Sequence, residues 1–173
     1  RWRSGWIRTA GLLALALAAR AAPVAAGPPP AFDGREAQSW IERQCALGPR
    51  VPGTPAHAAW LRRVTAYFDS LGVPCRRQAF RRPSPLGPDT LALANLLVEF
   101  RPGVRPRLLL GSHWDSRPWA DEDPDPAMRS LPVPGANDGA SSSAVLLVLA
   151  RLLRETPPPI GVDLAFFDME DMG

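Results

Sequence analysis

The most constraining feature of this sequence is a short, near-continuous hydrophobic run from Val162 to Asp168, which follows three consecutive prolines. A run of this length and character is typical of a strand inside a sheet that is covered on both faces. It is preceded by an apolar helical stretch at Ser141 to Arg154 and, earlier, by the strand-like segment Arg107 to Gly111. This order predicts an α/β domain with a mixed, largely parallel central sheet and helices on both faces.

Two further helices and a strand pair are predicted in the first half of the chain. Residues 33–48 begin with a capping box, and residues 54–72 begin with a capping threonine followed by proline at the first helical position. Pro74 to Phe80 and Thr90 to Phe100 have strand composition and are joined by a loop rich in proline and glycine. This spacing predicts an antiparallel pair.

A histidine and a carboxylate follow the strand predicted at residues 107–111. His113 then lies at the carboxyl end of a strand, where open α/β sheets place their ligand sites. Residues i and i+2 of an extended chain share a face, so Asp115 is expected to accept the imidazole N–H and direct the other ring nitrogen toward a metal. By itself this pattern is weak, because a strand-end histidine in a polar loop has the same sequence.

Two later segments strengthen the hypothesis of a metal site. Asp138 comes just before the long apolar helix, and the adjacent acids Glu170 and Asp171 follow the last hydrophobic strand. Histidine and carboxylate side chains are the ligands that zinc takes, so we expect His113, Asp138 and Asp171 to be metal ligands. Neighbours on an extended segment point in opposite directions, so Asp171 is expected to face the metal while Glu170 faces the substrate as general acid and base.

The segments 112–121, 135–141 and 166–173 together resemble the co-catalytic zinc aminopeptidases and the glutaminyl-peptide cyclotransferases, which share one fold. Within that group they resemble the bacterial glutaminyl cyclases most closely. The resemblance runs from about Leu47 to Gly173 and includes a loop at Leu47 to Thr54 that is similar to one near the start of the domain. It implies a zinc exopeptidase-like fold and a zinc-dependent enzyme that acts on peptide or protein N-termini.

The resemblance leaves two ligand schemes open. In the aminopeptidases Asp138 would bridge two zinc ions, with His113 on one and Asp171 on the other. In the cyclases one zinc would be held by Asp138, Asp171 and a later histidine, while His113 stays close to it. The family commonly has glutamate where Asp171 stands, although bacterial cyclases also show this aspartate.

The reaction implied also differs between the two schemes. A cyclase converts an N-terminal glutamine to pyroglutamate and releases ammonia, with Glu170 moving the proton and Asp115 assisting as the second catalytic residue. An aminopeptidase hydrolyses the first peptide bond, with Glu170 deprotonating the attacking water. A third hypothesis is a catalytically dead binding ectodomain, which the presence of all these residues argues against.

The first 26 residues have the pattern of a secretory signal peptide: a basic start, an apolar run from Ala10 to Ala19 and a small-residue cleavage site. The apolar run is shorter than the roughly 20 residues of a membrane span, so no stable anchor is expected after cleavage. Residues 27–173 are then expected to be the N-terminal portion of a zinc-dependent catalytic domain that continues beyond Gly173. The predicted location is secreted or periplasmic.

The net charge of the chain without its first 26 residues bears on nucleic-acid binding. Removing residues 1–26, which hold four arginines and no acid, changes the net charge from +3 to −1, so nucleic-acid binding has no support.

Cys45 and Cys75 can form a disulfide in an oxidising compartment or remain buried thiols, and the sequence leaves both open. His57 has no ligand-type neighbour at metal spacing, so we expect it to be structural or exposed. The proline-broken acidic loop at residues 117–134 is expected to rim the pocket.

Overall fold

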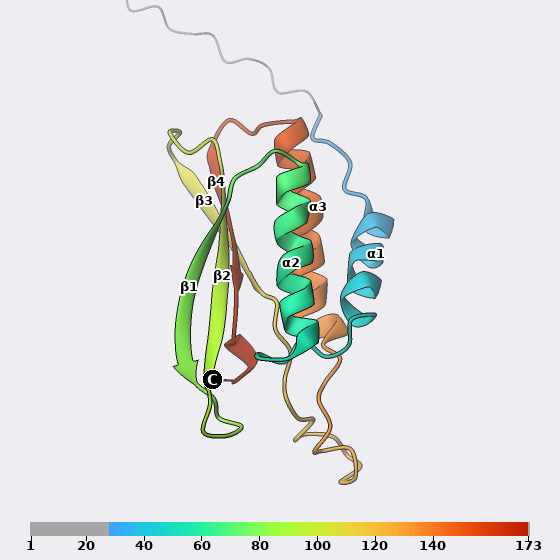
Figure 1. Ribbon diagram of the computed structural model, residues 1–173. Coiled ribbons are helices and arrows are strands. Elements are labelled where there is room, and N and C mark those ends of the chain that lie inside the picture. The colour runs from blue at the N-terminus through green and yellow to red at the C-terminus, as the bar shows by residue number, and fades with distance from the viewer. Residues whose placement is uncertain (1–27, 173) are drawn as a thin grey trace, which may run out of the picture.

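The computed structural model describes residues 28–172, so the predicted signal peptide at residues 1–26 lies outside the described chain. In the described part, three α-helices pack beside a four-stranded sheet (Figure 1). The helices are α1 (Gly34–Cys45), α2 (Pro55–Ser70) and α3 (Ser142–Glu155). The strands are β1 (Cys75–Pro83), β2 (Thr90–Phe100), β3 (Arg107–His113) and β4 (Gly161–Phe167).

The predicted helix starts are confirmed by their caps. The Asp33 carboxylate accepts hydrogen bonds from the backbone N–H groups of Arg35 and Glu36 at 2.8 and 3.2 Å, which satisfies donors that have no partner within the helix. The Thr54 hydroxyl accepts one from the N–H group of residue 57 at 3.3 Å. The capping box is only half formed, because the Glu36 side chain binds Arg151 of α3 instead of its own helix start. That ion pair joins α1 to α3.

The strands lie in the order β1-β2-β4-β3, and β4 is therefore an interior strand, as predicted. The expectation of a largely parallel sheet is wrong: β1–β2 and β2–β4 are antiparallel, and only β3–β4 is parallel. A short loop joins β1 to β2, and such a loop can only produce an antiparallel pair. A parallel pair needs a long crossover, which here is the connection from β3 through α3 to β4.

All three helices lie on one side of the sheet, so the expectation of helices on both faces is also wrong for the described residues (Figure 1). The side chains of Val162, Leu164 and Phe166 on β4 are buried in the core against the helices. Leu109 and Phe167 are 62% and 40% exposed. β3 and β4 carry apolar side chains on both faces, but among the described residues only one face of the sheet is covered by helices.

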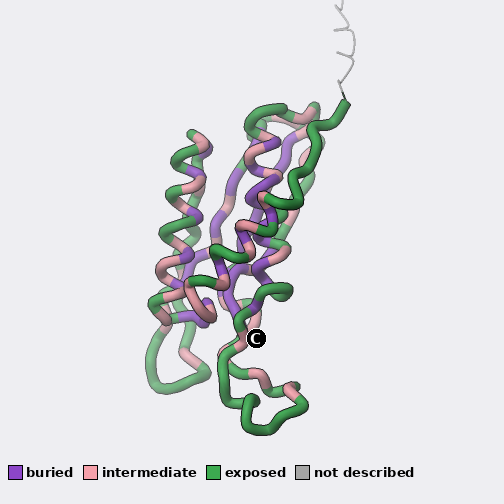
Figure 2. Tube along the Cα trace, turned by 90° about the vertical axis from the view of Figure 1, so that its right-hand side faces the viewer, coloured by how far each residue is buried: buried purple, intermediate pink, exposed green. Residues whose placement is uncertain are grey.

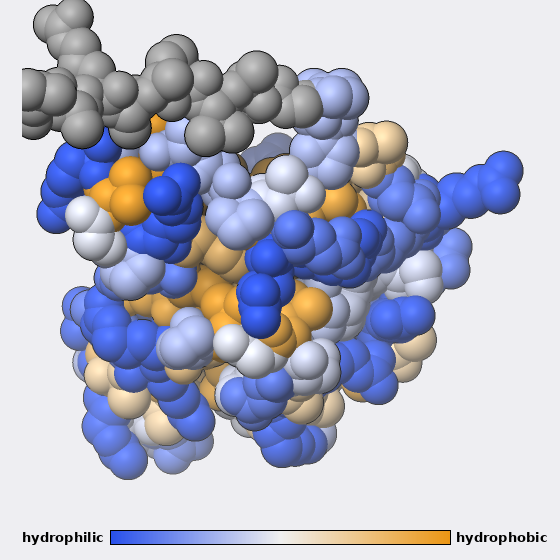
Figure 3. Space-filling view, turned by 90° about the horizontal axis from the view of Figure 1, so that it is seen from above, coloured by the Kyte–Doolittle hydropathy of each residue, from blue (hydrophilic) through white to orange (hydrophobic). Residues whose placement is uncertain are grey.

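The core fills the layer between the sheet and the helices. Figure 2 shows buried residues concentrated along the strands and the inner sides of the helices. Aromatic side chains link the layers: the rings of Phe68 on α2 and Phe166 on β4 pack edge to face, with 5.8 Å between their centroids. At the end of the molecule seen in Figure 3, hydrophobic side chains lie in the middle of a hydrophilic rim.

Two further findings concern features raised by the sequence. Cys45 and Cys75 are both free thiols, so of the two alternatives the unbridged one is present. Among the described residues, no helix combines the length and apolar character required to span a membrane.

Candidate metal centre

The candidate centre lies where β3 and β4 end side by side. His113 is the last residue of β3 and is paired in register with Phe167, the last residue of β4. Because the two strands are parallel, the residues that follow each of them emerge at the same edge of the sheet. This brings Asp115 and the acidic segment after β4 together, as the sequence predicted.

Asp138 reaches the same place on a tight turn, Ala136–Ser141, that leads into α3 and is called the Asp138 turn below. Its backbone leaves helical geometry at Asp138 (φ −86°, ψ 114°) and at Gly139 (φ 81°). A Cβ atom on Gly139 would lie 2.8 Å from the Asp115 carbonyl oxygen and 3.0 Å from Cε1 of His113. Glycine therefore allows the turn to approach the end of β3 closely enough for Asp138 to face the imidazole.

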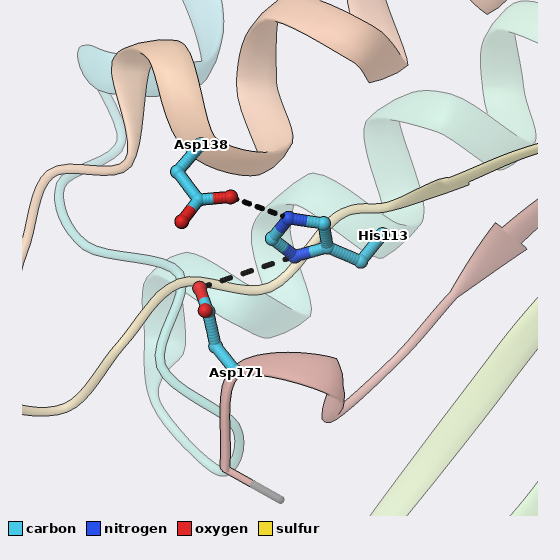
Figure 4. A group of neighbouring side chains, drawn as sticks. All are labelled: His113, Asp138 and Asp171. Carbon is cyan, nitrogen blue, oxygen red and sulfur yellow. Dashed lines mark hydrogen bonds and ion pairs between the residues drawn. The ribbon is translucent and has the colours of Figure 1, made fainter.

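The three expected ligands converge. Oδ1 of Asp138 lies 2.8 Å from Nε2 of His113, and Oδ2 of Asp171 lies 3.9 Å from Nδ1 of the same ring. One potential ligand atom from each residue lies within 4.8 Å of the others. Figure 4 shows the imidazole between the two carboxylates, which come from the Asp138 turn and from the segment after β4.

Asp115 is fully buried and does more than the sequence indicated. Its Oδ1 lies on the expected side of the His113 ring, but the expected hydrogen bond is not formed: the oxygen is 3.5 Å from Nδ1, and Nδ1 has no hydrogen-bond partner among the described residues. The two carboxylate oxygens accept hydrogen bonds from backbone N–H groups: Oδ1 from Glu170 at 3.1 Å and Oδ2 from Asp171 at 3.2 Å. Asp115 thus holds the main chain of the acidic pair against the end of β3.

The acidic pair is not extended, which corrects the expectation that Glu170 and Asp171 point in opposite directions. Met169 has a left-handed backbone (φ 65°), and Glu170–Met172 form a short 3-10 helix. A carboxylate oxygen of each acid lies 3.9 Å from Nδ1 of His113, so both side chains reach toward the same imidazole. Their surroundings still differ, because the Glu170 side chain is 63% exposed and that of Asp171 only 12%.

The electrostatics of the cluster favour a cation. Burial raises the pKa of Asp171, and the negative charge of Asp138 raises it further. The carboxylate of Asp115, together with that of Asp138, raises the pKa of His113 to about 9 although burial opposes this. Carboxylates packed this closely repel one another, and a bound divalent cation relieves that repulsion. One imidazole and two carboxylates also match the ligand types of zinc, so these residues fit a zinc ion.

A pocket of about 230 Å³ lies beside Asp171. Its walls come from the loop that was expected to rim the site and from the β1–β2 loop, and comprise Pro85, Arg117, Pro118, Trp119 and Met172. Apolar surface from Pro85, Pro118 and Trp119 thus lies next to convergent polar groups, a combination that is usual in small-ligand sites.

His57 is structural, as expected, and its partner was missed by the sequence analysis. Its Nε2 lies 2.7 Å from Oδ1 of Asp168, and its ring stacks on that of Trp114 at 4.3 Å between centroids. The other oxygen of Asp168 accepts a hydrogen bond from the backbone N–H group of Ala94 at 2.7 Å. The sequence does show that Asp168 ends an apolar strand and that the chain has two histidines. It does not show that Asp168 pairs with His57, because the two residues are 111 positions apart.

Both the sequence and the fold of this chain are similar to those of known proteins. The sequence model of Peptidase family M28 matches residues 95–173. The solved glutaminyl cyclase of Tannerella forsythia is 40% identical, with a TM-score of 0.77 over 82% of this chain and 48% of that one. A Zn-dependent exopeptidase from Parabacteroides distasonis is 37% identical, with a TM-score of 0.78 over 83% and 49%.

A leucine aminopeptidase precursor from Bacteroides thetaiotaomicron is 35% identical, with a TM-score of 0.78 over 83% of this chain and 49% of that one. The chain therefore spans about half the length of the solved structures that it matches. Residues 95–173, which contain every residue of the candidate centre, are similar to peptidase family M28, and the fold of the described chain is similar to that of bacterial glutaminyl cyclases and zinc-dependent exopeptidases.

Proposed function

We propose that this protein is a zinc-dependent glutaminyl-peptide cyclotransferase, which converts the N-terminal glutamine of peptides to pyroglutamate and releases ammonia. The observation that carries the proposal is the convergence of His113, Asp138 and Asp171 beside Glu170. This cluster lies on a fold that is similar to the glutaminyl cyclase of Tannerella forsythia at 40% identity.

Asp138 and Asp171 would hold the zinc ion in this proposal, with His113 close beside them. Bound there, zinc supplies Lewis-acid polarisation of the side-chain amide carbonyl of the substrate. Because the Glu170 side chain is 63% exposed beside the cluster, it is accessible to a substrate entering from solvent. His113 keeps its hydrogen bond to Asp138 and so orients that carboxylate.

Glu170 carries the proton in the reaction. The α-amine of the substrate attacks the side-chain amide carbon, a ring C–N bond forms, and the bond to the amide nitrogen breaks. Glu170 accepts the proton that the amine loses and returns it to the departing ammonia, so no other reactant is consumed. The peptide or protein N-terminus would lie in the pocket beside Asp171, where Trp119 and two prolines offer apolar surface to the glutamine methylenes. We propose a secreted or periplasmic location, on the strength of the signal-like residues 1–26.

A metallo-aminopeptidase is the second candidate. It is favoured by one specific observation: Oδ1 of Asp138 lies 2.8 Å from Nε2 of His113, and in the two-zinc scheme these two residues share one of the ions. The 35% identity to a leucine aminopeptidase precursor supports the same alternative.

The two candidates are separated by measuring zinc content and activity on the intact protein. Mass spectrometry of a glutaminyl peptide reports ammonia loss, and an aminoacyl-anilide reports hydrolysis. The proposal expects one zinc per chain, pyroglutamyl product, and a Glu170→Gln variant that keeps zinc but loses turnover. Two zinc ions with anilide hydrolysis would establish the aminopeptidase instead, and a zinc-free protein without turnover would leave neither standing.

A further inference from the structure

Arg50 lies in the connection between α1 and α2 and is fully buried. Arginine is rarely buried completely, and it then requires partners for its N–H groups. Here the guanidinium donates three hydrogen bonds to backbone carbonyls, from Nε to Trp114 at 3.0 Å, from Nη1 to Pro134 at 3.1 Å and from Nη2 to Gly135 at 2.9 Å.

These carbonyls belong to the two segments that carry the expected ligands. Trp114 stands between His113 and Asp115, and Pro134 and Gly135 lead into the Asp138 turn. The N–H groups of a guanidinium form a rigid planar fork, so simultaneous bonds to both segments set the separation between them. The fit is close, because a Cβ atom on Gly135 (φ 64°) would lie 2.9 Å from Nη2 of Arg50.

Two neighbouring contacts extend the same connection. The backbone carbonyl of Arg50 accepts a hydrogen bond from the N–H group of Ser116 at 3.3 Å. Gln44, near the end of α1, is also buried, and its Nε2 donates to the carbonyl of Ala140 at 2.8 Å. Arg50 therefore holds the beginning of the Asp138 turn, and Gln44 holds its end.

The charge of Arg50 supports a role at this site. Burial lowers the pKa of the guanidinium, and the negative charges of Asp115 and Asp171 oppose that effect. A buried positive charge near the carboxylate cluster offsets part of its mutual repulsion.

We propose that Arg50 is a positioning residue of the metal centre: it sets the spacing between the end of β3, which carries His113, and the turn that carries Asp138, while Gln44 holds the far end of that turn. The inference rests on the proposed function, in which this turn supplies a zinc ligand. It assigns a role to the loop at Leu47 to Thr54, which the proposed reaction does not use.

The test compares three variants of the intact protein. Arg50→Lys keeps the charge but places all donors on one nitrogen, and Gln44→Met removes the bond to Ala140. Arg107→Lys is the matched control, because Arg107 also binds a backbone carbonyl, that of Arg101, but lies at the opposite end of β3. Zinc affinity is measured by chelator competition, stability by the thermal midpoint, and local order by amide hydrogen exchange.

Arg50→Lys is expected to weaken zinc binding by about tenfold or more, the range seen when groups supporting metal ligands are removed. Its amide exchange should rise in residues 113–116 and 135–141. Arg107→Lys should keep the wild-type zinc affinity and the wild-type amide exchange in both segments. Equal zinc affinity in the two arginine variants, with unchanged exchange at both segments, would overturn the inference.

Two complications are covered by the design. If Arg50→Lys does not fold, Gln44→Met decides: weaker zinc binding at an unchanged midpoint supports the inference, and wild-type affinity refutes it. If the wild-type protein binds no zinc, the proposed function fails, and the exchange measurement alone decides whether Arg50 orders the two segments.

Discussion

Replacement of Asp115 by asparagine tests the geometry of the centre most directly. The carboxylate is fully buried, and its two oxygens accept hydrogen bonds from the N–H groups of Glu170 and Asp171. Asparagine has nearly the same shape but offers one oxygen and one NH₂ group. One of the two backbone N–H groups would then face another donor and lose its partner.

The expected magnitude follows from these two bonds. A hydrogen bond to a charged group contributes about 1.5–3 kcal/mol, and a buried N–H group left without a partner costs about 1–3 kcal/mol. We therefore expect Asp115→Asn to lower the free energy of unfolding by about 3 kcal/mol. The lost hydrogen bond also releases the segment that carries Glu170. If stabilisation of the transition state falls by the same amount, about 3 kcal/mol, kcat/KM falls about a hundredfold.

Urea denaturation measures the first effect, and steady-state kinetics on a glutaminyl peptide measure the second. Asp121→Asn is the matched control, because Asp121 is an exposed aspartate on the following loop. Its Oδ1 lies 3.5 Å from Nη1 of Arg117. Surface changes of this kind usually alter stability by less than about 0.5 kcal/mol. An Asp115→Asn protein with the stability and kcat/KM of the control would refute the assignment of Asp115 as the residue that holds the acidic pair.

Three further predictions concern other parts of the structure. Asp168→Asn weakens the buried hydrogen bond to the histidine of α2 and should lower the free energy of unfolding by about 1.5–3 kcal/mol in urea denaturation; a loss below about 0.5 kcal/mol would contradict a buried hydrogen bond at this carboxylate. Gly139→Ala places a Cβ atom 2.8 Å from the carbonyl oxygen of Asp115 and should therefore reduce the amount of bound zinc. Gly103→Ala has open space around its Cβ atom and should leave bound zinc unchanged. Equal zinc content in the two variants would disprove the close approach of the Asp138 turn to the end of β3. Burial raises the pKa of Cys75 to about 11, and the thiolate is the reactive form, so its alkylation in a variant lacking the other cysteine should keep rising up to about pH 11. A plateau reached near the ordinary thiol value of about 8.5 would show that the thiol is solvated.

Much of the local structure, and the proximity of the candidate ligands to one another, was predictable from the sequence. Asp33 and Thr54 mark the helix starts because a cap is formed by residues within three positions of one another. His113 and Asp171 are recognisable as strand-end residues because each follows an apolar run, and their convergence with Asp138 was expected from the three segments together, which resemble the zinc aminopeptidases and cyclases. In each case the signal is carried by neighbours along the chain.

The directions of the strands, the single covered face and the contacts within the centre were decided only by the tertiary structure. The sequence shows that β2 is a strand, but its antiparallel place beside β4 depends on which distant strand it meets. The oxygens of Asp115 bind backbone N–H groups 55 and 56 residues away, and the guanidinium of Arg50 binds carbonyls 64 to 85 residues away. A sequence determines which groups need partners, but partners so distant along the chain are chosen only when the strands and loops have packed against one another.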